Sequence, residues 1–472
     1  MLKANHALHD GEPADRDRFL VINLMEKVHF LTLGCPKNVA DSELMIGALA
    51  GAGFEVTLDP ESAQVLVVNT CAFIEAAKKE SIAAILEAAE VKRRASGRRL
   101  VVAGCMAQRY GAELRAEMPE VDIFVGTGNF LDLPELLRRT ETPETRPIPY
   151  SGAAHLLPAA AMTRATTGDF FTAYLKISEG CNHKCAFCII PKIRGLHESR
   201  ELDDVVAEAK SLAASGVREI NLIAQDLTAY GRDLKPASSL AALLRRLAQV
   251  EGLHWIRLLY CYPNFVTEEL LEAIAELPQI VKYIDIPLQH ADNEVLRAMK
   301  RERSGDALRR LLERIRRRIP EVAIRTSFIV GFPGETEQAH RNLMDFVEEQ
   351  QFDRVGVFTY SREENTAAFE LAGQLPERAK RERRAAIMEL QAGIARRKNQ
   401  SFLAKEIEVL VESSMPGRAS RMRGRMAGQA PEIDGMVILK GEVEPGEFVQ
   451  ARINRTLTYD LHGEIVGSTL AN

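Results

Sequence analysis

The sequence lacks any apolar run long enough to cross a membrane, and its polar N-terminal stretch lacks the apolar region of a secretory signal. We therefore predict a cytoplasmic protein that has no membrane partner and keeps its 7 cysteines reduced. The chain also lacks an excess of basic charge, because 61 Lys and Arg residues stand against 66 Asp and Glu residues. Non-specific binding to nucleic acid requires Lys and Arg side chains that neutralise phosphates, so only a local basic patch would support it.

The rest of the composition is ordinary for a globular protein. Hydrophobic residues make up 46% of the 472 residues and charged residues 27%, which provides enough apolar material for sizeable cores. This length predicts about two to four domains. Residues 1–24 are predicted to form a disordered extension, with Met25 as a candidate natural start. The segment from about residue 131 to 168 is rich in Pro, Thr and Ala, and it predicts a short helix followed by a linker at residues 141–168.

Three strand patterns in the N-terminal third each lead into a cysteine: residues 28–33 before Cys35, residues 65–68 before Cys71, and residues 100–102 before Cys105. A helical pattern follows each cysteine, and Asp41 or Ser42 is the expected N-cap of the first helix. This alternation predicts an α/β domain with a parallel sheet at residues 25–140.

The three cysteines are expected to converge, because ligands of a parallel sheet lie beyond the carboxyl ends of its strands. We predict one site of three thiolates from Cys35, Cys71 and Cys105. One alternative is three buried structural cysteines, since free Cys is among the most buried residue types. Another is zinc bound by the three cysteines and a water or His.

The middle of the chain, residues 169–396, shows six strand patterns separated by amphipathic helices. They fall at residues 173–178, 218–224, 255–261, 281–287, 322–330 and 353–360, with helical patterns around residues 205–213 and at about 238–250, 266–276, 292–317 and 335–350. Six consecutive units predict a parallel sheet curled into a partial (βα)6 barrel, since a full barrel needs two more strands.

A C-x3-C-x2-C array, Cys181, Cys185 and Cys188, directly follows the first of these strands. Three thiolates on one loop can bind three irons of a [4Fe–4S] cluster and leave the fourth iron open to a small molecule. A zinc site with His183 as fourth ligand is the alternative, but zinc loops usually pair their cysteines as C-x2-C, so His183 is predicted to be a solvated loop residue. The seventh cysteine, Cys261, is predicted to be a small buried residue.

The last part of the chain, residues 397–472, predicts a small β-barrel of the OB-like kind behind a charged, solvated helix at residues 378–398. The expected strands are short alternating runs at residues 407–411, 435–439, 448–453 and 456–460. Residues 400–472 carry eight Lys or Arg against ten Asp or Glu. This balance favours a basic protein partner over phosphate.

The cysteine loop and the strand pattern that follows it resemble the radical S-adenosylmethionine superfamily. The resemblance implies a [4Fe–4S] cluster on Cys181, Cys185 and Cys188 whose open iron binds S-adenosylmethionine, and an electron that releases a 5′-deoxyadenosyl radical. Expected contacts to this cofactor are Phe187 at the adenine, Gln225 and Asp226 at the amino group, and Gln289 and Gly331 at the ribose and adenine.

The three parts together, residues 25 to 470, resemble the methylthiotransferase family, whose C-terminal barrel is a TRAM domain. Two groups of this family act on tRNA adenosines, and a third modifies an aspartate of small-subunit ribosomal protein twelve. Four stretches are similar to the third group: residues 34–38 (Gly-Cys-Pro-Lys-Asn), 177–191, 224–231 and 430–435. A Met- and Arg-rich insert at residues 419–429 departs from the pattern and leaves the shape of the C-terminal barrel open.

The resemblance implies that Cys35, Cys71 and Cys105 hold an auxiliary [4Fe–4S] cluster that carries a sulfur. One S-adenosylmethionine methylates the sulfur, and a second yields the radical that removes hydrogen from the aspartate β-carbon. The reaction requires a reductant such as flavodoxin or ferredoxin and a sulfur donor. Two alternatives stay open: the same chemistry on a tRNA adenosine, and a non-catalytic iron–sulfur carrier.

Overall fold

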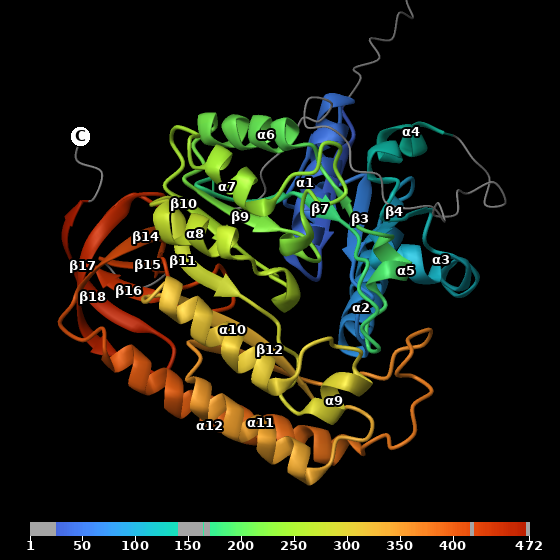
Figure 1. The fold of residues 1–472 in the computed structure, drawn as a ribbon. Coiled ribbons are helices and arrows are strands. Elements are labelled where there is room, and N and C mark those ends of the chain that lie inside the picture. The colour runs from blue at the N-terminus through green and yellow to red at the C-terminus, as the bar shows by residue number, and fades with distance from the viewer. Residues whose placement is uncertain (1–24, 140–163, 165–169, 416–419, 469–472) are drawn as a thin grey trace, which may run out of the picture.

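The computed structural model describes residues 25–139, 164, 170–415 and 420–468. The predicted extension at residues 1–24 and, except for Arg164, the predicted linker lie outside these residues. The described chain forms an N-terminal α/β unit, a central α/β unit and a C-terminal barrel, coloured blue, green to orange, and red in Figure 1. No helix in the described part of the chain combines the length and apolar character that a membrane crossing requires.

The N-terminal unit is built on a parallel sheet of five strands in the order β2-β1-β3-β4-β5. The strands are β1 (Lys27–Thr32), β2 (Glu55–Val56), β3 (Val65–Thr70), β4 (Arg99–Gly104) and β5 (Ile123–Val125), and the helices are α1 (Pro36–Gly51), α2 (Glu75–Arg93), α3 (Cys105–Glu117) and α4 (Leu133–Arg138). Successive residues of β3 point to opposite faces: Val65 and Val67 pack with α1, and Leu66 and Val68 pack with α2 and α3. The predicted parallel sheet is therefore present, with both faces covered.

Helix α1 begins earlier than the sequence predicts. Pro36 is its first residue and Cys35 its N-cap, whereas Asp41 and Ser42, the predicted caps, lie buried inside the helix. Proline at the first helical position is favourable because its missing N–H would have no partner there. The early start places the side chain of Asp41 in the interior.

The central unit is a six-stranded parallel sheet in the order β13-β12-β11-β10-β9-β6, as predicted for a partial barrel. Its strands are β6 (Thr172–Lys176), β9 (Glu219–Ile223), β10 (Trp255–Leu258), β11 (Ile280–Asp285), β12 (Ala323–Val330) and β13 (Arg354–Thr359). The helices are α5 (Ile190–Arg194), α6 (Leu202–Ala214), α7 (Leu240–Leu247), α8 (Glu268–Glu276), α9 (Asn293–Ala298), α10 (Gly305–Arg318), α11 (Glu337–Gln350) and α12 (Glu377–Gln400).

The two faces of this sheet have different neighbours. One face, which includes Leu222 and Leu258, packs on the helices that connect the strands. The opposite face carries Ile223, Trp255 and Tyr283, and it packs against Ala40 of α1 and against Leu410, Ala430 and Phe448 of the C-terminal barrel. We call this second face the inner face. The N-terminal unit and the barrel both contact it.

The predicted helix at residues 292–317 is divided into α9 and α10. The chain leaves the helical path at Lys300, which has a φ of 55°, and the Ser304 hydroxyl accepts a hydrogen bond from the Ala307 N–H to start α10. At this break the Met299 carbonyl accepts a hydrogen bond from the Ala186 N–H at 2.9 Å, which links the end of α9 to the cysteine loop.

The C-terminal unit is a closed five-stranded barrel in the order β14-β15-β16-β18-β17. Its strands are β14 (Glu406–Ser414), β15 (Arg421–Met426), β16 (Val437–Lys440), β17 (Phe448–Thr456) and β18 (Leu461–Ser468). Most of residues 456–460, a predicted strand, instead forms the turn between β17 and β18, closed by a hydrogen bond from Leu457 to Asp460. The Met- and Arg-rich insert supplies strand β15. The insert therefore completes the barrel.

Helix α12 has one exposed and one buried side. Arg378 and Glu382 are exposed, as predicted, while Ile387 and Ile394 pack in the core of the central unit. Lys380 does not fit the prediction of a solvated run: it is 4% exposed and donates a hydrogen bond to the Tyr360 carbonyl. Its stem lies against Gly331, which tolerates this contact because it has no side chain.

Candidate functional site

The structure brings the three N-terminal cysteines together at the carboxyl edge of the first sheet. Cys35, Cys71 and Cys105 directly follow or closely follow the neighbouring strands β1, β3 and β4. A Cβ built on Gly34 would lie 2.8 Å from the Cys71 Cβ, so the loop of Cys35 rests on Cys71. The Cys105 thiol in turn lies 3.9 Å from the Asn38 Oδ1, at the start of α1. The predicted convergence is therefore confirmed.

Cys181, Cys185 and Cys188 lie on the loop that follows β6. This loop is closed by a pair of short strands, β7 (Ser178–Glu179) and β8 (Glu198–Ser199), and by a hydrogen bond from the Cys181 N–H to the Gly195 carbonyl. Inside the loop the Cys188 N–H donates to the Cys185 carbonyl at 3.1 Å. The backbone therefore fixes the three thiols relative to one another.

Gly180, directly before Cys181, is required for this closure. Its φ is +77°, and a Cβ there would stand 2.0 Å from the Leu196 carbonyl oxygen. We expect Gly180→Ala to destabilise the protein by more than about 1 kcal/mol and to lower its iron content after anaerobic reconstitution. The matched control is Gly252→Ala, because Gly252 also has a positive φ, +88°, but a Cβ there would meet nothing closer than 3.7 Å. Equal iron content in the two variants would contradict this account of the loop.

Burial raises the pKa of the thiols at both sites. It is about 12 for Cys105 and Cys188 and about 11 for Cys181. A bare thiolate is disfavoured in such surroundings, so binding of a cation by the sulfurs is needed to hold the deprotonated form. The described residues contain no group of three or more His, Cys, Asp or Glu placed to hold a single metal ion.

His183 is not the solvated loop residue that the sequence predicts. Its Nε2 lies 2.7 Å from Asp226 Oδ2, and its ring stacks on Tyr262 with centroids 3.6 Å apart. These contacts take the imidazole away from the role of a fourth zinc ligand and pin the cysteine loop to the end of β9.

A guanidinium lies beside each group of thiols. Arg194 Nη2 is 3.3 Å from Cys105 Sγ, and Arg301 Nη1 is 3.6 Å from Cys185 Sγ. A positive donor next to a sulfur stabilises its thiolate form and the negative charge of a thiolate-bound cluster. Neither arginine was predicted from the sequence.

A buried ion network joins the two groups of thiols. Arg194, 2% exposed, contacts Asp41 of α1 at 2.8 Å and Glu179 at 3.2 Å. Lys176 contacts the same two carboxylates at 2.6 and 2.8 Å. Although burial favours the protonated form of Glu179, Lys176 and Arg194 hold its pKa at about 2. Glu179 therefore stays charged, and together with Asp41 it fixes Arg194 between Cys105 and the loop that leads to Cys181.

Of the predicted cofactor contacts, Phe187 lies on the cysteine loop, and Gln225, Gln289 and Gly331 follow strands β9, β11 and β12. Phe187 packs against a cluster that includes Phe332 and Tyr360. Gln225 donates to Glu179, and its Oε1 has no hydrogen-bond partner among the described residues. Gln289 has a φ of 74° and bridges to Phe328 of β12. Gly331, with a φ of 72°, donates its N–H to Glu335.

Asp226 has both of its carboxylate oxygens engaged. Oδ2 binds His183, and Oδ1 accepts hydrogen bonds from the N–H and hydroxyl of Thr228 at 2.9 and 2.5 Å. Cys261 is 1% exposed and packs in the core of the central unit, as expected for a small buried residue.

Lys37 and Tyr260 meet next to Cys35. Lys37 lies in the first turn of α1, and its Nζ is 3.4 Å from the centre of the Tyr260 ring, which follows β10. Burial lowers the pKa of Lys37, and the nearby Cys35 is the largest opposing influence. Burial and then the Cys35 charge raise the pKa of Tyr260.

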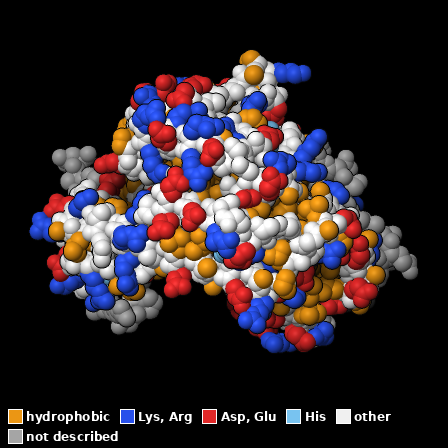
Figure 2. Space-filling view, turned by 60° about the horizontal axis from the view of Figure 1, so that its bottom comes forward, with side chains coloured by type: hydrophobic (Ala, Val, Ile, Leu, Met, Phe, Trp, Pro, Cys, Tyr) orange, Lys and Arg blue, Asp and Glu red, His pale blue; other side chains and the backbone are white. Residues whose placement is uncertain are grey.

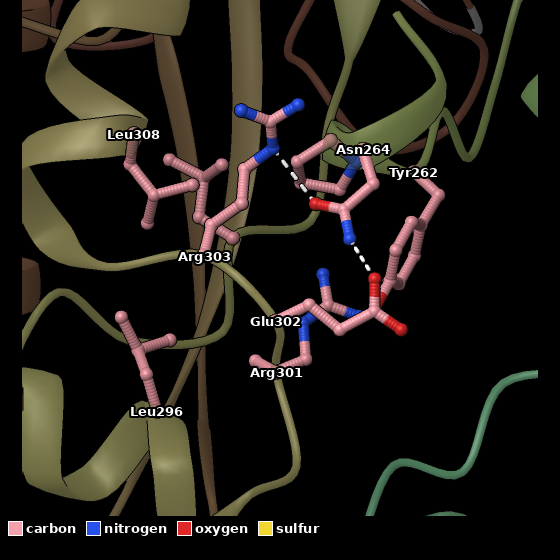
Figure 3. Close-up of a pocket in the computed structure, with 9 residues that line it drawn as sticks. Tyr262, Asn264, Leu296, Arg301, Glu302, Arg303 and Leu308 are labelled. Carbon is pink, nitrogen blue, oxygen red and sulfur yellow. Dashed lines mark hydrogen bonds between the residues drawn. The ribbon is translucent and has the colours of Figure 1, made fainter.

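A small pocket lies between the end of β10 and helix α10 (Figure 3). Tyr262, Asn264, Leu296, Arg301 and Leu308 are among its lining residues. In this pocket Arg303 donates to Asn264 at 2.7 Å, and Asn264 donates to Glu302. These bonds hold the segment from which Arg301 reaches Cys185.

Three family models match the chain in the order of its three units. They are "Uncharacterized protein family UPF0004" at residues 27–126, "Radical SAM superfamily" at residues 175–347 and "TRAM domain" at residues 405–466. A solved structure of the radical S-adenosylmethionine methyltransferase TsrM from Kitasatospora setae has a similar fold, with a TM-score of 0.55 at 16% identity. The alignment covers 73% of this chain and 74% of that one. Fold and cysteine loop together define a radical S-adenosylmethionine enzyme.

Relatives of known name identify the family within this class of enzymes. The "Ribosomal protein uS12 methylthiotransferase RimO" of Geobacter sulfurreducens is 47% identical over 94% of this chain and 99% of its own length. The protein of the same name from Anaeromyxobacter sp. strain K is 50% identical over 93% of each chain. The chain belongs to the RimO family of radical S-adenosylmethionine methylthiotransferases.

Proposed function

We propose that this enzyme methylthiolates the β-carbon of an aspartate in ribosomal protein uS12, in the cytoplasm. The observation that carries the proposal is the pair of three-thiol groups joined through Arg194 and Glu179. Methylthiolation needs a radical source and a sulfur source in one place, and this arrangement provides a site for each. The names of the relatives supply the substrate.

The donor sets fit two [4Fe–4S] clusters. Each group provides three thiols and one guanidinium, and three thiolates leave the fourth iron of a cubane cluster without a protein ligand. The ligands of one metal ion must converge on a point, whereas the thiolates of a cluster bind different irons.

When bound, the cluster at Cys181, Cys185 and Cys188 supplies the electron that cleaves one S-adenosylmethionine, and the cluster at Cys35, Cys71 and Cys105 supplies the sulfur that a second one methylates. The chain's own residues position these groups. Arg194 and Arg301 offset the negative charge of the thiolates, and Asp226 fixes the cysteine loop through His183. Phe187, Gln225, Gln289 and Gly331 line the approach of S-adenosylmethionine. The reductant, such as flavodoxin or ferredoxin, and the sulfur donor are separate partners that bind to this enzyme.

Surface charge supports a protein substrate over tRNA. On the face shown in Figure 2, Lys and Arg side chains are interspersed with Asp and Glu side chains. The barrel also pairs several of its exposed basic residues, for example Arg452 with Glu406 and Lys440 with Glu464. Tracking of a phosphate backbone requires a continuous basic surface instead.

Mass spectrometry of uS12 and of bulk tRNA from a deletion strain tests the proposal. We expect uS12 to lose the mass of one methylthio group at an aspartate, tRNA to keep its methylthioadenosine, and the gene on a plasmid to restore uS12. Loss of the tRNA modification with uS12 intact would assign the enzyme to tRNA. Intact modification of both, with no 5′-deoxyadenosine formed by the reconstituted protein, would indicate an iron–sulfur carrier.

A further inference from the structure

Lys37 is a buried lysine without a polar partner among the described residues. Seven Lys and Arg residues of the described chain are buried. Six donate hydrogen bonds to carboxylate or carbonyl oxygens: Arg194, Arg200, Arg257, Arg354, Lys380 and Arg425. Lys37 is 8% exposed, and its Nζ has the Tyr260 ring as its contact, with no hydrogen bond or ion pair to any described residue. The Nζ of Lys37 therefore keeps its hydrogen-bond donors for a ligand from outside the chain.

The carboxylates around Lys37 are already occupied. Asp41 and Glu179 are shared by Lys176 and Arg194. Asp285 accepts from Arg325 at 2.9 Å and from the Tyr260 N–H at 3.1 Å. The Nζ of Lys37 is therefore available to an anionic ligand.

Lys37 lies where a substrate group could react. It is two residues from Cys35, and the ring beneath it follows a strand of the central sheet. Tyr260 has a φ of 68°, which is unfavourable for a tyrosine and is held by the bond to Asp285. Asp434 of the C-terminal barrel lies 3.4 Å from Arg325, so all three units contribute to this location.

We propose that Lys37 binds the side-chain carboxylate of the substrate aspartate and holds its β-carbon next to the Cys35 thiol group. The β-carbon is bonded to the carboxyl carbon, so a grip on the carboxylate fixes the carbon that reacts. Lys37 is then a specificity-determining residue, because neither asparagine nor a nucleobase offers it a negative charge. This inference rests on the proposed function.

The test measures binding of two ligands to reconstituted enzyme without oxygen: uS12, and uS12 with the target aspartate replaced by asparagine. A charge-assisted hydrogen bond predicts that wild type binds the aspartate form about 10- to 100-fold more tightly. In Lys37→Met, which keeps an unbranched side chain one atom shorter and removes the amine, the ratio of the two Kd values should fall to near one. Lys184→Met is the control, because Lys184 is an exposed residue of the other cysteine loop.

Three results would overturn the inference. They are a wild-type ratio near one, an unchanged ratio in Lys37→Met, and loss of iron from Lys37→Met to the level of a Cys35→Ala variant. The last would make Lys37 a support of the cluster rather than of the substrate. The proposed function fails separately, if wild type leaves the aspartate form of uS12 unmodified.

Discussion

A Cys185→Ala variant should form no 5′-deoxyadenosine above the level of a reaction without enzyme. The three thiols of the loop after β6 are fixed by the β7–β8 pair and by backbone bonds within the loop, so no other described cysteine can replace Cys185. Two thiolates leave a second iron of the cluster without its ligand. The variant also leaves Arg301 without its sulfur partner.

The measurement is chromatography of an anaerobic reaction that contains S-adenosylmethionine and dithionite. Cys261→Ala is the matched control, because Cys261 is buried in the core of the central unit and belongs to neither group of thiols. The control should keep its activity, since removing one sulfur from a core costs about 1 kcal/mol. Product formation by Cys185→Ala at the control's rate would refute the assignment of this loop.

Glu219→Gln should lower the free energy of unfolding by about 3–5 kcal/mol. Glu219 is fully buried at the start of β9, between Arg257 of the central sheet and Arg425 of the C-terminal barrel, at 3.0 and 2.5 Å. Although burial opposes its charge, the two arginines hold the pKa of Glu219 at about 2. The neutral amide would leave two buried guanidiniums facing each other where the barrel meets the inner face.

Urea denaturation followed by tryptophan fluorescence reports this effect, because Trp255, the one Trp of the chain, packs against Phe448 of the barrel. Glu464→Gln is the control: its pair with Lys440 is exposed, so the free energy of unfolding should change by less than about 0.5 kcal/mol. Since the folded pKa of Glu219 is depressed, its contribution is present above the ordinary pKa of 4.5 and is lost as the pH falls toward about 2. Equal free energies of unfolding for the two variants would show that the ion pairs of Glu219 with Arg257 and Arg425 do not hold the barrel in place.

The cysteines were predictable from the sequence because their placement follows from local rules. Each N-terminal cysteine closely follows a strand of a parallel sheet, and strand ends of such sheets meet at one edge. The six central strands were predictable for the same reason, since their hydrophobic runs alternate with amphipathic helices. Strands β2 and β5 were missed, because two and three residues are too few to show a period.

The charged part of the site was not predictable, because most of its pairs join residues far apart in the sequence. Asp41 looked like a helix cap, yet it pairs with Lys176 and Arg194. One signal in the sequence indicated that Asp41 is buried: it lies four residues before Met45, on the same side of α1. Strand β15 was missed for a related reason: the buried Arg425 within it pairs with Glu219, 206 residues away, and with Glu412 of β14.

Iron and acid-labile sulfide in anaerobically reconstituted protein test the central claim most directly, with wild type compared to a variant in which Cys35, Cys71 and Cys105 are all Ala. The claim is that these thiols hold a second cluster next to the one on the loop after β6. We expect two clusters in wild type and one in the triple variant, which should still cleave S-adenosylmethionine but transfer no methylthio group. Equal iron content in the two proteins would contradict it.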